Sequence, residues 1–101
     1  MEQTTEQQLQ EKYGTFYTLE VEDSNGKSIK VYLRKLDRKT YQVVSKLMEK
    51  DSLMAIESLI ASLYIGGDDY KLITEDFDAL RSADSALIDM IRPKQGSLKK
   101  N

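Results

Sequence analysis

The sequence of 101 residues contains no cysteine, no histidine and no tryptophan, and it has only one proline. Without cysteine the chain has no disulfide framework, no zinc–thiolate site and no thiol nucleophile. Without histidine it lacks the commonest metal ligand and the commonest general base near neutral pH. We therefore expect a protein that is not an enzyme, with no catalytic residue, no metal ligand and no cofactor.

Long hydrophobic runs are also missing. No stretch approaches the roughly 20 apolar residues that span a bilayer. Residues 1–12 contain no apolar core of the kind that defines a signal peptide. We expect a cytoplasmic protein that does not contact a membrane.

Charge is distributed in blocks, although the net charge is only −2. Residues 27–50 carry +6, residues 51–91 carry −7 and residues 92–101 carry +4. The acidic overall balance argues against a dedicated nucleic-acid binder. An alternative interpretation takes the run Arg34, Lys35, Arg38 and Lys39 as a phosphate-contacting cluster of a small nucleic-acid-associated regulator.

The length favours one domain, which we place at residues 13–93. Residues 1–12 consist mainly of Gln, Glu and Thr around a single Leu9. Such a segment buries too little apolar surface to offset the conformational entropy that it would lose on folding. Residues 94–101 follow the only proline and are rich in lysine. The sequence predicts a flexible polar arm before the domain and a flexible basic tail after it.

Alternating apolar residues predict an antiparallel hairpin around residues 23–26. A two-residue Asn25–Gly26 loop would split the apolar residues between the two faces. A three-residue loop instead pairs Val21 with Ile29, Leu19 with Val31 and Tyr17 with Leu33, and it places Gly26 where a positive φ is required. The sequence predicts the second register.

Three helices are predicted after the hairpin, so the expected fold class is α+β, with an N-terminal antiparallel hairpin followed by three α-helices. The first helix spans residues 38–50 behind the N-cap Asp37. The second begins at Asp51 or Ser52 and runs to Ile65. The third is capped by Thr74, carries an apolar stripe that includes Phe77 and Leu80, and ends at Arg92–Pro93, with an interruption at Ser82 or Ser85 left open.

The segment Gly66-Gly67-Asp68-Asp69 invites a phosphate or calcium site. A phosphate loop, however, leads from a strand into a helix N-terminus, whereas these glycines follow a predicted helix. A calcium loop also needs further oxygen ligands over about a dozen residues. We favour a helix stop followed by a turn.

Apolar side chains in excess of one small core indicate a protein partner. Phe16 and Tyr32 lie on the outer face of the predicted hairpin, where alternation favours polar residues. Met48, Met54 and Met90 either fill the core or repack against a partner. The residues predicted at a partner surface are Phe16, Tyr32, Arg34, Met54 and Tyr64. A second copy of the chain is an alternative partner, and the hairpin edges are open to strand addition.

Short segments resemble small phage-encoded tail assembly chaperones. They are residues 13–17 (YGTFY), 31–35 (VYLRK), 37–40 (DRKT) and 65–68 (IGGD), with a closing helix and the Lys-rich end at 98–101 (LKKN). The resemblance covers residues 13–101. It implies no catalytic residue. It implies a helper in the cytoplasm of a bacterial host that holds a tail component, such as the tape-measure protein, during tail-tube assembly; a minor structural component of the virion is an alternative.

Overall fold

The computed structural model describes residues 5–91 and 96–100. Within these residues the chain is an α+β protein with one three-stranded antiparallel sheet and five helices. In chain order the elements are α1 (Thr5–Tyr13), β1 (Phe16–Glu22), β2 (Ser28–Arg34), α2 (Arg38–Lys50), α3 (Ser52–Leu63), β3 (Tyr64–Gly67), α4 (Lys71–Thr74) and α5 (Phe77–Ile91).

The β1–β2 hairpin has the predicted register. Leu19 pairs with Val31 and Glu20 pairs with Lys30. The loop is closed by the Asp23 N–H, which donates to the Lys27 carbonyl at 2.9 Å. Gly26 has a φ of 79°, which is the left-handed conformation that the three-residue loop requires. The alternation of apolar residues was therefore sufficient to choose between the two registers.

The α2–α3 pair also begins where the sequence predicted. The Asp37 side chain accepts a hydrogen bond from the Thr40 N–H at 2.7 Å and caps α2. Asp51 ends α2 and caps α3, because its carboxylate accepts from the N–H groups of Leu53 and Met54, both at 3.1 Å. A single aspartate in an extended conformation thus separates two helices that pack against each other.

The prediction that the second helix runs to Ile65 was wrong. Helix α3 ends at Leu63, and Tyr64–Gly67 forms the strand β3, which pairs antiparallel with β2. Tyr32 lies opposite Gly66, and the register shifts between Tyr32 and Leu33. The free edge of β2 supplies hydrogen-bonding partners that the helical pattern of the sequence does not reveal. Gly66 and Gly67 are strand residues, so the predicted helix stop and turn at these positions was also wrong.

The predicted start of the third helix was wrong as well. Thr74 ends the short helix α4, and α5 begins at Phe77. Asp76 caps α5: its Oδ1 accepts from the Ala79 N–H at 2.9 Å, and its carbonyl accepts from the Leu80 N–H. Asp and Thr are both good caps, so the local sequence did not separate the two positions. Helix α5 is continuous to Ile91, while its predicted end at Arg92–Pro93 lies outside the described residues.

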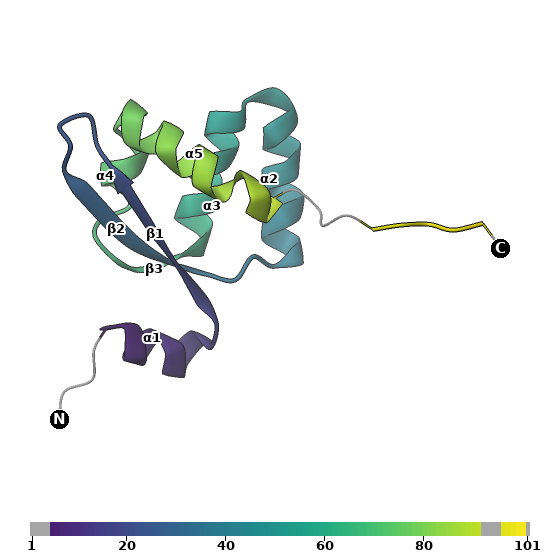
Figure 1. The fold of residues 1–101 in the computed structure, drawn as a ribbon, viewed down its shortest axis with the longest axis horizontal. Coiled ribbons are helices and arrows are strands. Elements are labelled where there is room, and N and C mark those ends of the chain that lie inside the picture. Colours follow the sequence, from purple (N-terminus) through teal and green to yellow (C-terminus); the bar gives the residue numbers. More distant parts are fainter. Residues whose placement is uncertain (1–4, 92–95, 101) are drawn as a thin grey trace.

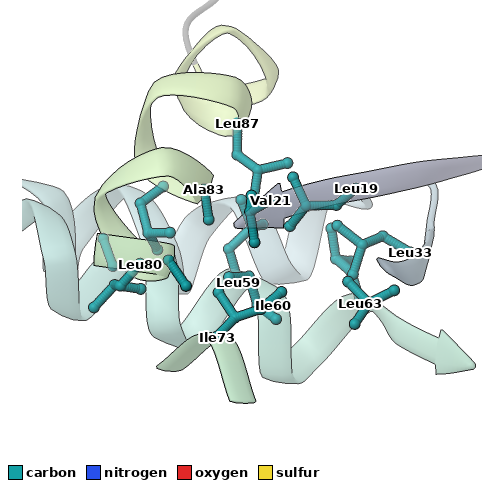
Figure 2. Close-up of a cluster of buried hydrophobic side chains, with 14 of the residues drawn as sticks. Leu19, Val21, Leu33, Leu59, Ile60, Leu63, Ile73, Leu80, Ala83 and Leu87 are labelled. Atoms are coloured by element: carbon teal, nitrogen blue, oxygen red, sulfur yellow. The ribbon is translucent and has the colours of Figure 1, made fainter. Parts of the chain in front are cut away.

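Helices α3 and α5 cover one face of the sheet, and α2 packs on α3 (Figure 1). The core lies between these layers. Figure 2 shows Leu19 and Val21 of β1 directed toward Ala83 and Leu87 of α5. Among the described residues no polar or charged side chain is buried. Burial of this apolar set is the main stabilising contribution to the fold.

Helix α1 lies on the opposite face of the sheet, at residues where a flexible polar arm was predicted. Leu9 is buried, and its methyl carbons lie within 3.8 Å of the position that a Cβ on Gly66 would occupy. Leu9 is therefore the buried apolar side chain through which α1 packs on the sheet. Of the predicted basic tail, residues 96–100 are exposed and have no helix or strand; the remainder lies outside the described residues.

Candidate partner-binding surfaces

The aromatic pair Phe16 and Tyr32 is present on the outer sheet face, but α1 covers part of it. The two rings pack edge to face with centroids 5.7 Å apart. Tyr32 is only 7% exposed, and its hydroxyl donates to Glu6 of α1 at 3.2 Å. Phe16 is half-buried. Helix α1, in the segment where the sequence predicted a flexible arm, therefore covers Tyr32, and the role of Phe16 and Tyr32 in partner binding stays a prediction.

Lys30 forms the second polar contact of α1 with the sheet. Its Nζ lies 3.4 Å from the Glu6 carboxylate and 5.7 Å from the centre of the Tyr32 ring. The neighbouring phenol of Tyr32, followed by the hydrogen bond to Glu6, raises the pKa of Lys30 above its ordinary value. These groups are exposed, so the ion pair contributes little to stability.

Arg34 holds together the ends of three elements. Its guanidinium donates to the Asp37 carboxylate at 3.0 Å and to the Ser62 carbonyl near the end of α3 at 3.1 Å. Longer bonds reach the Lys35 carbonyl and the Thr40 hydroxyl. The Thr40 N–H, and to a lesser extent Arg34, lower the pKa of Asp37. Arg34 therefore has a structural role in this fold, whereas Lys35, Arg38 and Lys39 of the same basic run are exposed.

Tyr64 lies in a small aromatic cluster beside β3. Its ring centre is 5.1 Å from that of Tyr70, and its hydroxyl donates to the Gly67 carbonyl at 3.3 Å. The following Asp68 fixes the end of β3 on β2: its N–H donates to the Lys30 carbonyl at 2.8 Å, and its carboxylate accepts from the Lys30 N–H at 2.9 Å. The contacts of the Gly-Gly-Asp segment are therefore contacts of strand pairing.

Met54 is the predicted partner residue that remains well exposed, at 51%. Two further apolar side chains on the next helices are also exposed, Leu72 at 47% and Phe77 at 62%. Phe77 was predicted to belong to the buried stripe of the third helix. It lies at the first position of α5, beyond the part of the helix that packs on the core, and its ring is 5.7 Å from the Arg81 guanidinium.

Two shallow hollows lie beside α5, and one of them also borders β1. One, of about 390 Å³, is lined by Glu20, Val21, Glu22, Ser28 and Ser82. The other, of about 310 Å³, is lined by Asp78, Arg81, Ser82 and Ser85. Both are open to solvent and share Ser82. In the described part of the chain, no group of three or more Asp or Glu side chains is arranged to hold a metal ion.

No protein-family model, curated protein or solved structure matches the chain. None of the helices in residues 5–91 is long and apolar enough to cross a membrane.

Sequence reasoning missed Leu72 and misplaced Phe77. The exposure of Leu72 and Phe77 could have been predicted from two aspartates, Asp69 before α4 and Asp76 after it, which are typical of turns and helix starts. Asp69 accepts from the Lys71 N–H at 3.0 Å, and Asp76 caps α5. These two aspartates confine α4 to one turn, which limits the number of its apolar side chains that can face the core.

Proposed function

We propose that this chain is a non-catalytic protein-binding module that acts in phage tail assembly, as a chaperone for an apolar tail component such as the tape-measure protein. The resemblance of its short segments to tail assembly chaperones is the reason for naming this process. The surface of the folded chain is the reason for naming its mode of action.

One observation carries the proposal: Met54, Leu72 and Phe77 remain about half exposed or more on the consecutive helices α3, α4 and α5, while the core beneath these helices is closed. These side chains are not needed to complete the core. A partner's apolar segment that covers them would gain roughly 25 cal/mol for each Å² of apolar surface removed from water. Methionine adapts to differently shaped partners.

Co-purification with fragments of a tape-measure protein tests the proposal. A tagged full-length chain is co-expressed with each fragment, and the soluble fragment that it retains is measured. We expect the wild-type chain to retain at least one fragment and the triple variant Met54→Ser, Leu72→Ser, Phe77→Ser to lose most of it.

The matched control is Val43→Ser on α2, which removes an apolar side chain of similar exposure, 52%, from a different helix. Its retention of the fragment is expected to equal that of the wild type. Equal capture by the wild type and the triple variant would contradict the assignment of Met54, Leu72 and Phe77 as partner contacts. Capture of no fragment, with no change in fragment solubility, would contradict the function.

A further inference from the structure

Strand β1 forms an edge of the sheet. The strand order is β1-β2-β3, so among the described residues β2 lies on one side of β1 and no strand lies on the other. With seven residues β1 is longer than the opposite edge strand β3, which has four. A long edge strand presents a row of backbone groups that can pair with another chain.

The register identifies the backbone groups that face outward from this edge. Asp23 and Lys27 form a hydrogen-bonded pair at the loop, and such pairs alternate along an antiparallel ladder. Glu20 and Lys30 therefore form a non-hydrogen-bonded pair. This agrees with the Lys30 backbone, whose N–H and carbonyl both bond to Asp68 on the β3 side. The N–H and carbonyl groups of Thr18, Glu20 and Glu22 consequently point away from β2, toward the open edge.

Space for an additional strand lies beside this edge. One hollow lies between the end of β1, at residues 20–22, and Ser82 of α5, and the second continues from Ser82 along α5 past Ser85. Helix α5 packs on the face of β1 that carries Leu19 and Val21, through Ala83 and Leu87 (Figure 2). An edge strand flanked by a helix is a common site at which an extended peptide is bound by strand addition.

The charge of the edge selects a basic peptide. Glu20, Glu22 and Asp78 line the hollows together with a single cation, Arg81. The described C-terminal segment of the chain has the opposite charge: Lys99 and Lys100 follow Leu98, which is fully exposed. This segment has no helix or strand and runs away from the sheet in Figure 1, so it does not lie on the edge of its own chain.

We propose that the β1 edge binds the basic C-terminal segment of a second copy of this chain as a fourth strand of the sheet. The backbone groups of Thr18, Glu20 and Glu22 supply the hydrogen bonds, and the acidic side chains select the lysines. In an extended segment alternate residues face opposite sides, so Lys99 lies on the face opposite to that of Leu98 and Lys100. The backbone bonds supply the affinity and the charges supply the selectivity.

Amide hydrogen exchange measured residue by residue tests the proposal directly. The probe is a synthetic peptide of residues 94–101, added to the full-length protein. In the free protein we expect β2 to protect the amides of Leu19 and Val21, whereas the amides of Thr18, Glu20 and Glu22 should exchange faster. Saturating peptide should slow exchange at the second set by about tenfold or more. Unchanged exchange at these amides, or equal slowing at odd and even positions of β1, would overturn the proposal.

Modified peptides separate strand addition from a purely electrostatic contact. One peptide is N-methylated at Ser97 and Lys99, and the other at Leu98 and Lys100, so each loses a different set of alternate backbone donors. One of the two should lose binding and the other should retain it. Retention by both would overturn the proposal. A peptide with Lys99→Glu and Lys100→Glu should bind several-fold more weakly, and equal binding would also contradict the assignment.

Self-association of the full chain provides the test in the intact protein. Sedimentation velocity at protein concentrations up to about 1 mM covers the weak affinities typical of small interfaces. We expect concentration-dependent association that is lost on deletion of residues 94–101. A strictly monomeric full-length chain, or protection of Thr18, Glu20 and Glu22 that does not depend on concentration, would contradict binding by a second copy. These experiments use this chain alone and no tail component. A negative result here would therefore contradict strand addition without bearing on the proposed function.

Discussion

Replacement of Gly67 by alanine is expected to be among the most damaging single-methyl changes in the sheet. A Cβ on Gly67 would lie 2.6 Å from the Lys30 carbonyl oxygen and 2.9 Å from the Val31 Cα, both of which belong to the backbone of β2. Gly67 also has a φ of 91°, which L side chains rarely adopt. The substitution therefore combines an unfavourable φ with a contact that requires β2 and β3 to separate.

Alanine substitutions at two other glycines separate the cost of the unfavourable φ from the cost of the close contact. Gly26 has a similar φ of 79°, but a Cβ there would meet nothing within 4 Å. Gly66 has no positive φ, and its Cβ would lie 3.7 Å from Leu9, at ordinary contact distance. We expect Gly26→Ala to cost about 1–2 kcal/mol from conformation alone. Gly67→Ala should cost a further 1–3 kcal/mol or so from overpacking. Gly66→Ala should change stability by about 0.5 kcal/mol or less.

Urea unfolding followed by far-ultraviolet circular dichroism measures all three variants under one set of conditions. The free energy of unfolding, extrapolated to water, is expected to fall in the order Gly66→Ala, Gly26→Ala, Gly67→Ala, with Gly67→Ala the least stable. Failure of Gly67→Ala to fold, with Gly26→Ala folded, would agree with the same order. Equal losses at Gly26 and Gly67 would refute the close approach of β3 to β2.

Three further predictions concern the core, a helix cap and acid stability. Leu59→Ala removes a fully buried side chain and should lower the free energy of unfolding by about 2–5 kcal/mol in urea titrations; a loss below 1 kcal/mol would contradict its central position. Asp51→Ala removes the cap of α3 and should cost about 1 kcal/mol, measured in the same way, with an unchanged value arguing against the cap. The hydroxyl of Ser24 and, after it, the Ala79 N–H lower the pKa of Asp76, so the stability from this carboxylate is fully present above the unfolded-state pKa and is lost as pH falls below about 4. Ser24→Ala should reduce this loss between pH 5 and pH 2 in thermal melts, and an unchanged pH profile would contradict the link.

The hairpin and the first two helix starts were predictable because local rules decide them. Register follows from keeping Leu19, Val21 and their partners on one face, a condition that the three-residue loop satisfies and the two-residue Asn25–Gly26 loop does not. Asp37 and Asp51 have the residue type and the spacing of N-caps, and both act as caps. In these segments the neighbouring residues alone favour the structure that forms.

Strand β3 and helix α1 were not predictable because distant parts of the chain determine them. Tyr64 and Ile65 continue the apolar pattern of α3. They form a strand because they pair with the edge of β2, which is distant in the sequence. The sequence of α1 is mainly polar, and its buried residue, Leu9, packs against Gly66 of a strand that is distant in the sequence. One predicted partner residue, Tyr32, is covered on the same face, where its hydroxyl donates to Glu6 of α1. The exposure of Phe77 likewise depends on where α5 begins.

Light scattering coupled to size-exclusion chromatography of the chain co-expressed with a tape-measure protein tests the proposed function most directly. We predict a soluble complex whose mass exceeds that of either protein alone, and a smaller yield of this complex for Phe77→Ser than for the control Val43→Ser. Elution of the chain at the mass that it has alone, with the tape-measure protein remaining insoluble, would contradict the proposal that this protein acts by covering an apolar tail component.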